Sequence, residues 1–184
     1  MDDLSRDPIV NTVQNGIERA IRVALENNCL AAAVILILSG IDSMAYLDMP
    51  EDQKDVARSD FIRWADRYIK FPSKEQLAGI DLYGARCAAL HQYGSASALS
   101  REGKCRMVGY MDASIPEVRY DPSVSNDFVL VSVPALAEAF FTGVDRFLID
   151  LFSDAKKAPV AERRFNKMFQ SIPVEKGAKD SGAV

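Results

Sequence analysis

The sequence predicts a mainly α-helical fold, an antiparallel bundle of four to five helices with a small β-hairpin-like insertion. Two observations predict it. Apolar residues recur at three- and four-residue spacing along most of the chain, and β-branched segments separated by prolines occur between about residues 105 and 133. We expect residues 1–172 to form a single helical domain, and residues 173–184, which are polar and small, to form a flexible C-terminal tail.

The composition is that of a globular protein, with 48% hydrophobic and 26% charged residues. The net charge of −4 argues against broad non-specific binding of nucleic acid, which needs a basic face, but allows a small positive pocket. Three widely spaced cysteines indicate neither a disulfide framework nor a zinc knuckle, so we expect a reducing, cytoplasmic compartment. One histidine and scattered acids offer no ligand spacing, so we expect no metal and no cofactor.

The first helix is expected to begin at Asp7-Pro8, where an acidic cap precedes a proline at the first helical position. Asn27-Asn28 are expected to end it. Its apolar stripe consists of Val10, Val13, Ile17, Ile21 and Leu25. Its charged residues lie off that stripe: Glu18, Arg19, Arg22 and Glu26.

A second helix is expected from about Cys29 to Leu47, with apolar residues on nearly every side through Ile37. Such a helix must be surrounded by protein, and dimer formation would help to surround it. Its uncharged apolar stretch ends at Ile41 and is shorter than the roughly 20 residues that a membrane span requires. We therefore expect a core helix and no membrane association.

Two further helices are expected before the β insertion. Ser59-Asp60 cap the third, which Phe71-Pro72 end. Ser73 and Gln76 match a capping box that opens the fourth, which stops near Gly94.

The insertion and the last helices follow. The expected strands are Cys105–Met111 and Phe128–Val133, read as a hairpin with a long loop. Helical periodicity returns after Pro134, and a shorter amphipathic helix is expected over Val160–Phe169.

Arg86 and His91 are the residues in the fourth helix that suggest chemistry, since they stand in otherwise apolar surroundings. A buried arginine needs a carboxylate partner. Asp42 is the preferred candidate because it ends the apolar run of the second helix, and Asp81 and Asp145 are the alternatives. A purely structural ion pair is the competing interpretation of Arg86, as a helix cap is of His91.

The arrangement Arg86-x-x-x-x-His91, late in a helix of an all-α bundle, resembles the HEPN superfamily, which is marked by an arginine followed after four to six residues by a histidine. The surrounding Leu82-Tyr83-Gly84-Ala85-Arg86-Cys87 and Leu90-His91 look like the motif helix of that superfamily. The resemblance extends over Asn28 to Asp154, while the motif itself concerns two residues.

The resemblance implies a metal-independent endoribonuclease that acts as a homodimer, with two Arg/His pairs meeting in one cleft. His91 would then be the general acid and base in attack of a ribose 2′-OH on phosphorus, and Arg86 would hold the scissile phosphate. It equally implies relatives that have lost activity and serve as binding or assembly modules, and it leaves open a place in a toxin–antitoxin pair. The chain departs from the family in having Cys87 where a polar residue often follows the arginine.

Helix geometry predicts that the two motif residues diverge. At about 100° per residue, five positions place Arg86 and His91 roughly 140° apart around an ideal helix. They would converge on a substrate where the helix unwinds near Gly94, or across the edge of a dimer cleft.

Two basic clusters are present. Arg101, Lys104 and Arg106 follow the motif helix closely and are the candidate phosphate contacts if RNA or a nucleotide binds. Arg163, Arg164 and Lys167 lie on the last helix and are expected to solvate it.

The sequence thus leaves two hypotheses. The first is a HEPN-like homodimer that cleaves RNA, or binds RNA or a nucleotide, at Arg86 and His91. The second is a non-catalytic assembly or partner-binding protein in which Arg86 organises the core through an ion pair with Asp42.

Overall fold

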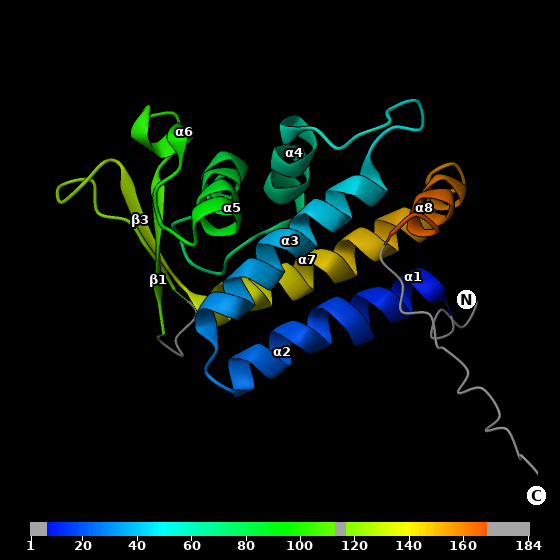
Figure 1. Cartoon of the computed structure of the whole chain (residues 1–184), viewed down its shortest axis with the longest axis horizontal. Helices are drawn as coiled ribbons and strands as arrows, with labels where there is room; N and C mark the ends of the chain where they lie inside the picture. Colours follow the sequence, from blue (N-terminus) through cyan, green and yellow to red (C-terminus); the bar gives the residue numbers. More distant parts are fainter. Residues whose placement is uncertain (1–6, 113–116, 169–184) are drawn as a thin grey trace, which may run out of the picture.

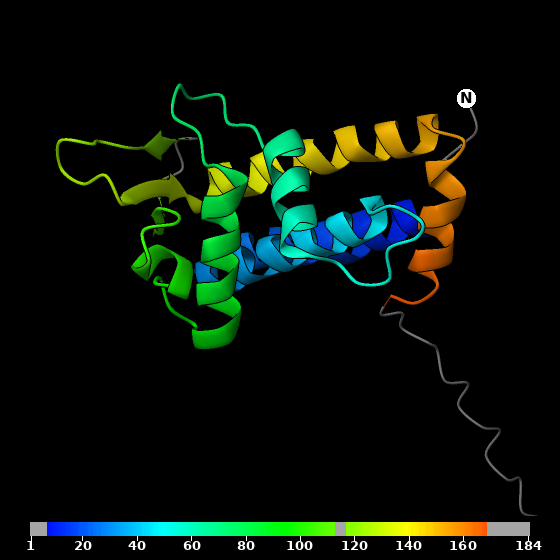
Figure 2. The same cartoon turned by 90° about the horizontal axis from the view of Figure 1, so that it is seen from above.

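The computed structural model describes residues 7–112 and 117–168 and is mainly helical, with one small sheet. The N-terminal helix and the two longest helices run side by side along the long axis, α4 and α5 lie across them, and the sheet stands at one end (Figure 1, Figure 2). The mainly α fold class with a small β part is therefore as predicted. The elements in chain order are α1 (Pro8–Asn11), the π-helix η2 (Thr12–Glu18), α2 (Arg19–Glu26), α3 (Leu30–Asp48), α4 (Arg58–Tyr68), α5 (Gly79–Gln92), α6 (Ala98–Arg101), β1 (Met107–Met111), β2 (Val118–Arg119), β3 (Phe128–Ser132), α7 (Val133–Ser153) and α8 (Lys157–Phe165).

Helix α3 lies at the centre of the fold and contacts α2, α4, α5, α7 and α8. Its inner side is fully buried, and it approaches α7 so closely that a Cβ added at Gly40 would lie 2.6 Å from the ring of Phe140. One stripe of the helix stays open or half-buried, and it includes Ala32, Ile35, Ser39 and Asp42. Protein therefore surrounds α3 as expected, except along this stripe.

Among the described residues, α3 is the one helix long and apolar enough to cross a membrane by length and composition, with a mean hydropathy of 2.0. The helix runs as predicted to within one residue at each end, and it continues past the uncharged apolar stretch through Asp42 to Asp48. Half of the most apolar part of this helix is buried inside the protein. That burial is typical of the core helix of a soluble protein, so α3 is weak evidence for a membrane span.

The N-terminal helix begins at Pro8 as predicted, with the Asp7 carboxylate accepting hydrogen bonds from the backbone N–H groups of Ile9 and Val10. Glu18 was expected to lie off the apolar stripe with the other charged residues of this helix, but it is only 7% exposed. Glu18 ends the π-helix η2, whose wider turns rotate the following positions around the axis and carry the carboxylate inward. One Glu18 oxygen lies 3.5 Å from Arg22, and the other has no hydrogen-bond partner among the described residues.

We predict that Glu18→Gln stabilises the protein at neutral pH. Burial, and then Asp145 of α7, raise the pKa of Glu18, although Arg22 acts in the opposite direction. A carboxyl whose pKa is raised by folding makes its full contribution to the free energy of unfolding below its unfolded pKa. That contribution is lost as the pH rises through the folded pKa. Thermal melts should show a higher melting temperature for the variant at neutral pH and none of this gain below about pH 4. Exposed Glu26→Gln is the control, and an equal gain at both pH values would contradict the explanation.

The helix that carries the motif begins at Gly79, later than the Ser73/Gln76 capping box predicted. The side chain of Gln76 instead closes the preceding turn, accepting from the N–H of Phe71 at 3.0 Å and donating to its carbonyl at 2.9 Å. Asp81 caps the helix, with Oδ2 3.0 Å from the N–H of Ala78. The predicted start was wrong because the glutamine amide is engaged in the loop.

The two predicted strands do not form a hairpin with each other, although β2 and β3 are antiparallel neighbours joined by one loop. Strand β3 lies between β1 and β2, parallel to β1 and antiparallel to β2. Parallel neighbours need a crossover connection, and β2 belongs to the segment that makes it. The hairpin prediction was wrong because local patterns identify strands without giving their pairing direction.

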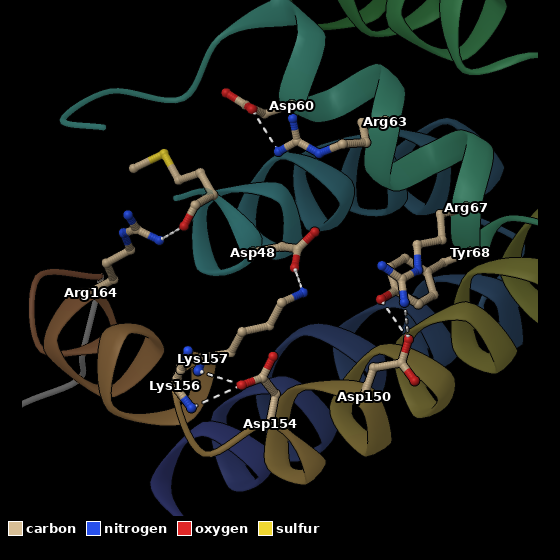
Figure 3. A network of polar contacts seen from close by, with 11 residues as sticks. Asp48, Asp60, Arg63, Arg67, Tyr68, Asp150, Asp154, Lys156, Lys157 and Arg164 are labelled. Carbon is tan, nitrogen blue, oxygen red and sulfur yellow. Dashed lines mark hydrogen bonds and ion pairs between the residues drawn. The ribbon is translucent and has the colours of Figure 1, made fainter. Parts of the chain in front are cut away.

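Helix α8 is tied to the end of α3 and to the loop that follows (Figure 3). Arg164 is 7% exposed and donates hydrogen bonds to the backbone carbonyls of Met49 and Pro50. Lys157 lies 2.9 Å from Asp48, the last residue of α3. The expectation that Arg164 solvates the last helix was therefore wrong, because it satisfies carbonyls that follow a helix end. The predicted tail, residues 173–184, lies outside the described residues.

We predict that Arg164→Ala destabilises the protein by about 2 kcal/mol, because two backbone carbonyls lose a charged donor. Chemical denaturation measures this change. Arg163→Ala is the matched control: its ion pair with Glu51 is exposed on both sides, so it should have little effect. Equal effects of the two variants would show that Arg164 does not anchor α8.

Candidate functional site

Arg86 lies in α5 and reaches across to α3, where its Nε is 2.8 Å from Oδ2 of Asp42. Asp42 is thus the acid that Arg86 contacts. Of the two alternatives, Asp81 is paired with Arg106, and Asp145 influences Glu18 on the far side of the N-terminal helix. The Arg86 and Asp42 side chains are 25% and 23% exposed, so the pair lies at the protein surface and not in the core.

His91 is exposed, and its Nε2 lies 3.4 Å from Nη1 of Arg86. The two residues point in different directions from the helix axis, but the Arg86 side chain is long enough to reach the His91 ring. A guanidinium donates and cannot accept, so this contact is a hydrogen bond only when Nε2 is unprotonated and the ring proton sits on Nδ1. Arg86 therefore links Asp42 to His91 on one surface.

The surroundings keep Arg86 cationic. Partial burial disfavours its charge, but the hydrogen bond and charge of Asp42 outweigh burial and raise the pKa of Arg86. Neighbouring Tyr83 packs edge-on against Phe61, with ring centroids 5.4 Å apart. Burial first, and then the Cys87 thiol, raise the pKa of Tyr83, so its hydroxyl stays protonated. The site is thus one fixed cation held by an acid, beside an exposed imidazole.

The predicted phosphate contacts have other partners. Arg106 binds Asp81, with Nη2 2.6 Å from Oδ2, and Lys104 lies 2.7 Å from Glu102. Arg101 donates to the carbonyl of Ala96 at 3.2 Å. Within the described residues, no hydrogen bond or ion pair joins these three side chains to the motif. Arg106 is anchored most firmly, because Asp81 is only 3% exposed.

A pocket of about 810 Å³ opens beside the motif, between α3, the end of α5 and β1. Tyr93 follows α5 in the left-handed conformation, with φ of 50°, and is 73% exposed. The opposite side includes Tyr110 and Asp112. Sequence reasoning missed all three residues. An aromatic residue directly before the helix-ending Gly94 was a local signal for Tyr93, whereas nothing local indicated the other two.

Asp42 also lines a second pocket, of about 660 Å³, between the N-terminal helix and α3. Its walls include Ile17 of the π-helix, Leu36 and Tyr46, so it is largely apolar. Asp42 is thus positioned by α3 with space on one side and Arg86 on the other.

No protein-family model, no curated protein and no solved structure matches this chain. Among the described residues, no three His, Cys, Asp or Glu side chains gather to hold a metal ion. The site is therefore assessed on its geometry, an Asp–Arg–His chain beside an open pocket.

We predict that Arg86→Ala costs much less stability than Arg106→Ala. Removal of Arg86 leaves Asp42 partly in water, at a cost of about 1 kcal/mol, whereas removal of Arg106 strips its main cation from a buried carboxylate, at about 3 kcal/mol. Denaturant titration compares the two variants directly. Equal losses would mean that Arg86 serves the fold as Arg106 does.

Proposed function

We propose that this chain is a HEPN-like, metal-independent endoribonuclease that acts as a homodimer in the cytoplasm and uses Arg86 and His91. The observation that supports it is the contact of Arg86 with both Asp42 and His91, which gathers a fixed cation and a proton-transfer group on one surface. An arginine has five N–H donors, so these contacts leave donors for a phosphate.

The chemistry follows from the two residues. When the substrate phosphate replaces the ring as acceptor of the Arg86 N–H, His91 Nε2 takes the proton of a ribose 2′-OH as the 2′ oxygen bonds to phosphorus. The bond from phosphorus to the 5′ oxygen breaks, and a protonated imidazole or water returns a proton to that oxygen. The products carry a 2′,3′-cyclic phosphate and a 5′-hydroxyl. Arg86 offsets the charge that develops on the phosphoryl oxygens, and Asp42 holds Arg86 in place for that task.

A homodimer would supply positive charge for RNA binding that one chain lacks. The net charge of −4 gives RNA no broad basic face, and the cations predicted to assist are paired elsewhere. Two copies meeting near His91 would bring two arginines and two imidazoles to one cleft. Two small exposed residues of α3, Ala32 and Ser39, leave room for such a meeting.

We predict that His91→Ala lowers RNA cleavage in EDTA by about 10²- to 10⁴-fold without changing the melting temperature, because an exposed acid/base group is lost. Gel analysis of a mixed RNA pool, with detection of cyclic phosphate ends, measures the rate. Gln92→Ala is the matched control, since this neighbour is equally exposed and has no role in the mechanism. Undiminished cleavage by His91→Ala would contradict the assignment of His91 as the acid/base group.

The second candidate is a non-catalytic assembly or partner-binding protein, favoured by the direct 2.8 Å ion pair between Arg86 and Asp42. It requires Arg86 to matter for stability or dimerisation. A wild-type dimer that neither cleaves nor binds RNA, together with a large loss of stability in Arg86→Ala, would select this function.

A further inference from the structure

The 810 Å³ pocket lies along the same side of both helices as the ion pair. On α5, Arg86, Ala89 and Tyr93 recur at spacings of three and four residues, so they share one face. On α3, Asp42, Ile35 and Ala31 share a face in the same way. Ala89, Tyr93, Ile35 and Ala31 all line the pocket. At about 1.5 Å per residue, Tyr93 lies roughly 10 Å along α5 from Arg86.

The lining of this pocket has a distinct chemistry. Aliphatic side chains of α3 form its floor, while Tyr93 and Tyr110 contribute aromatic rings from two different elements. Among the described residues that line it there is no lysine or arginine, and Asp112 is its one charged group. A phosphate would be repelled here, whereas a flat, uncharged, partly apolar group would be accepted.

We propose that this pocket binds a nucleobase next to the phosphate held by Arg86, and that Asp112 selects bases with an exocyclic amino group over uracil. The inference rests on the proposed function for the phosphate at Arg86. RNA recognition commonly splays single-stranded bases onto aromatic side chains, and Tyr93 is exposed enough to receive one. A carboxylate accepts a hydrogen bond from the amino group of cytosine, and uracil presents a carbonyl there instead.

The phosphate and the base would be bound at different places, which explains why the described residues that line the pocket include no cation. Arg86 carries the positive charge on the face of α5 that also bears the pocket residues Ala89 and Tyr93, and Asp112 lines the pocket together with Tyr110 and Met111 of β1. A nucleotide spanning the two would place its phosphate at Arg86 and its base between the tyrosines. The β insertion thus contributes to base recognition by bringing β1 beside the end of α5.

The test compares short 2′-O-methyl oligocytidylate and oligouridylate by isothermal titration calorimetry with the full-length protein. These ligands keep the RNA sugar but cannot be cleaved, since the 2′ oxygen carries no proton, so binding is measured apart from catalysis. Wild type should prefer cytidylate roughly tenfold. Tyr93→Asn, which tolerates the left-handed backbone, should weaken binding on the order of 5- to 150-fold, while Tyr93→Phe keeps the stacking ring and should change it little.

Asp112→Asn completes the test, since an amide presents both a donor and an acceptor and should erase the preference for cytidylate. Equal binding of both oligonucleotides by wild type, or no effect of Tyr93→Asn, would overturn the base pocket even if RNA is cleaved at His91. A cytidylate preference that depends on Tyr93 supports the pocket even if no RNA is cleaved, and then only catalysis fails. A Tyr93→Asn variant that loses dimerisation while wild type binds no oligonucleotide would assign the pocket to the interface between copies and overturn the proposal.

Discussion

The burial of α3 is the constraint on which the rest of this structure depends. A helix with this many apolar side chains is stable in water only when other elements cover it, and five helices of the chain do so. Its glycine at position 40 allows Phe140 of α7 to sit directly against the backbone. The same burial leaves one stripe uncovered, and Asp42 is on that stripe.

The position of the candidate site follows from this arrangement. Because α3 is held by its neighbours, Asp42 presents a fixed carboxylate to α5, and Arg86 crosses to meet it. The arginine then reaches His91 along its own helix. The pocket beside them forms where α5 ends at Tyr93 and β1 approaches α3. The site therefore combines residues of three elements, α3, α5 and β1.

Two arginine–aspartate pairs, each with one member on α5, differ in burial. Arg106, directly before β1, binds a nearly inaccessible Asp81, which also caps α5, so this pair holds the start of the sheet against the helix. Arg86 and Asp42 are about a quarter exposed and face a histidine and a pocket. In the first pair only the carboxylate is shielded, whereas both side chains of the second pair are partly open. Sequence alone treated Arg106 as a substrate contact because exposure is decided by the packing of distant segments.

The sequence by itself determined the features that depend on neighbouring residues. The Asp7-Pro8 start, the Asn27-Asn28 break and the apolar α3 were predicted from local caps, turns and periodicity, whereas Asp42 was preferred as the partner of Arg86 because it ends the apolar run of α3. Only the tertiary structure decided the parallel pairing of β1 with β3, the burial of Glu18 and Arg164, and the pocket between Tyr93 and Tyr110. These features depend on which distant segments meet, and that is decided by the packing of whole helices around α3 because no short stretch of residues encodes its distant neighbours.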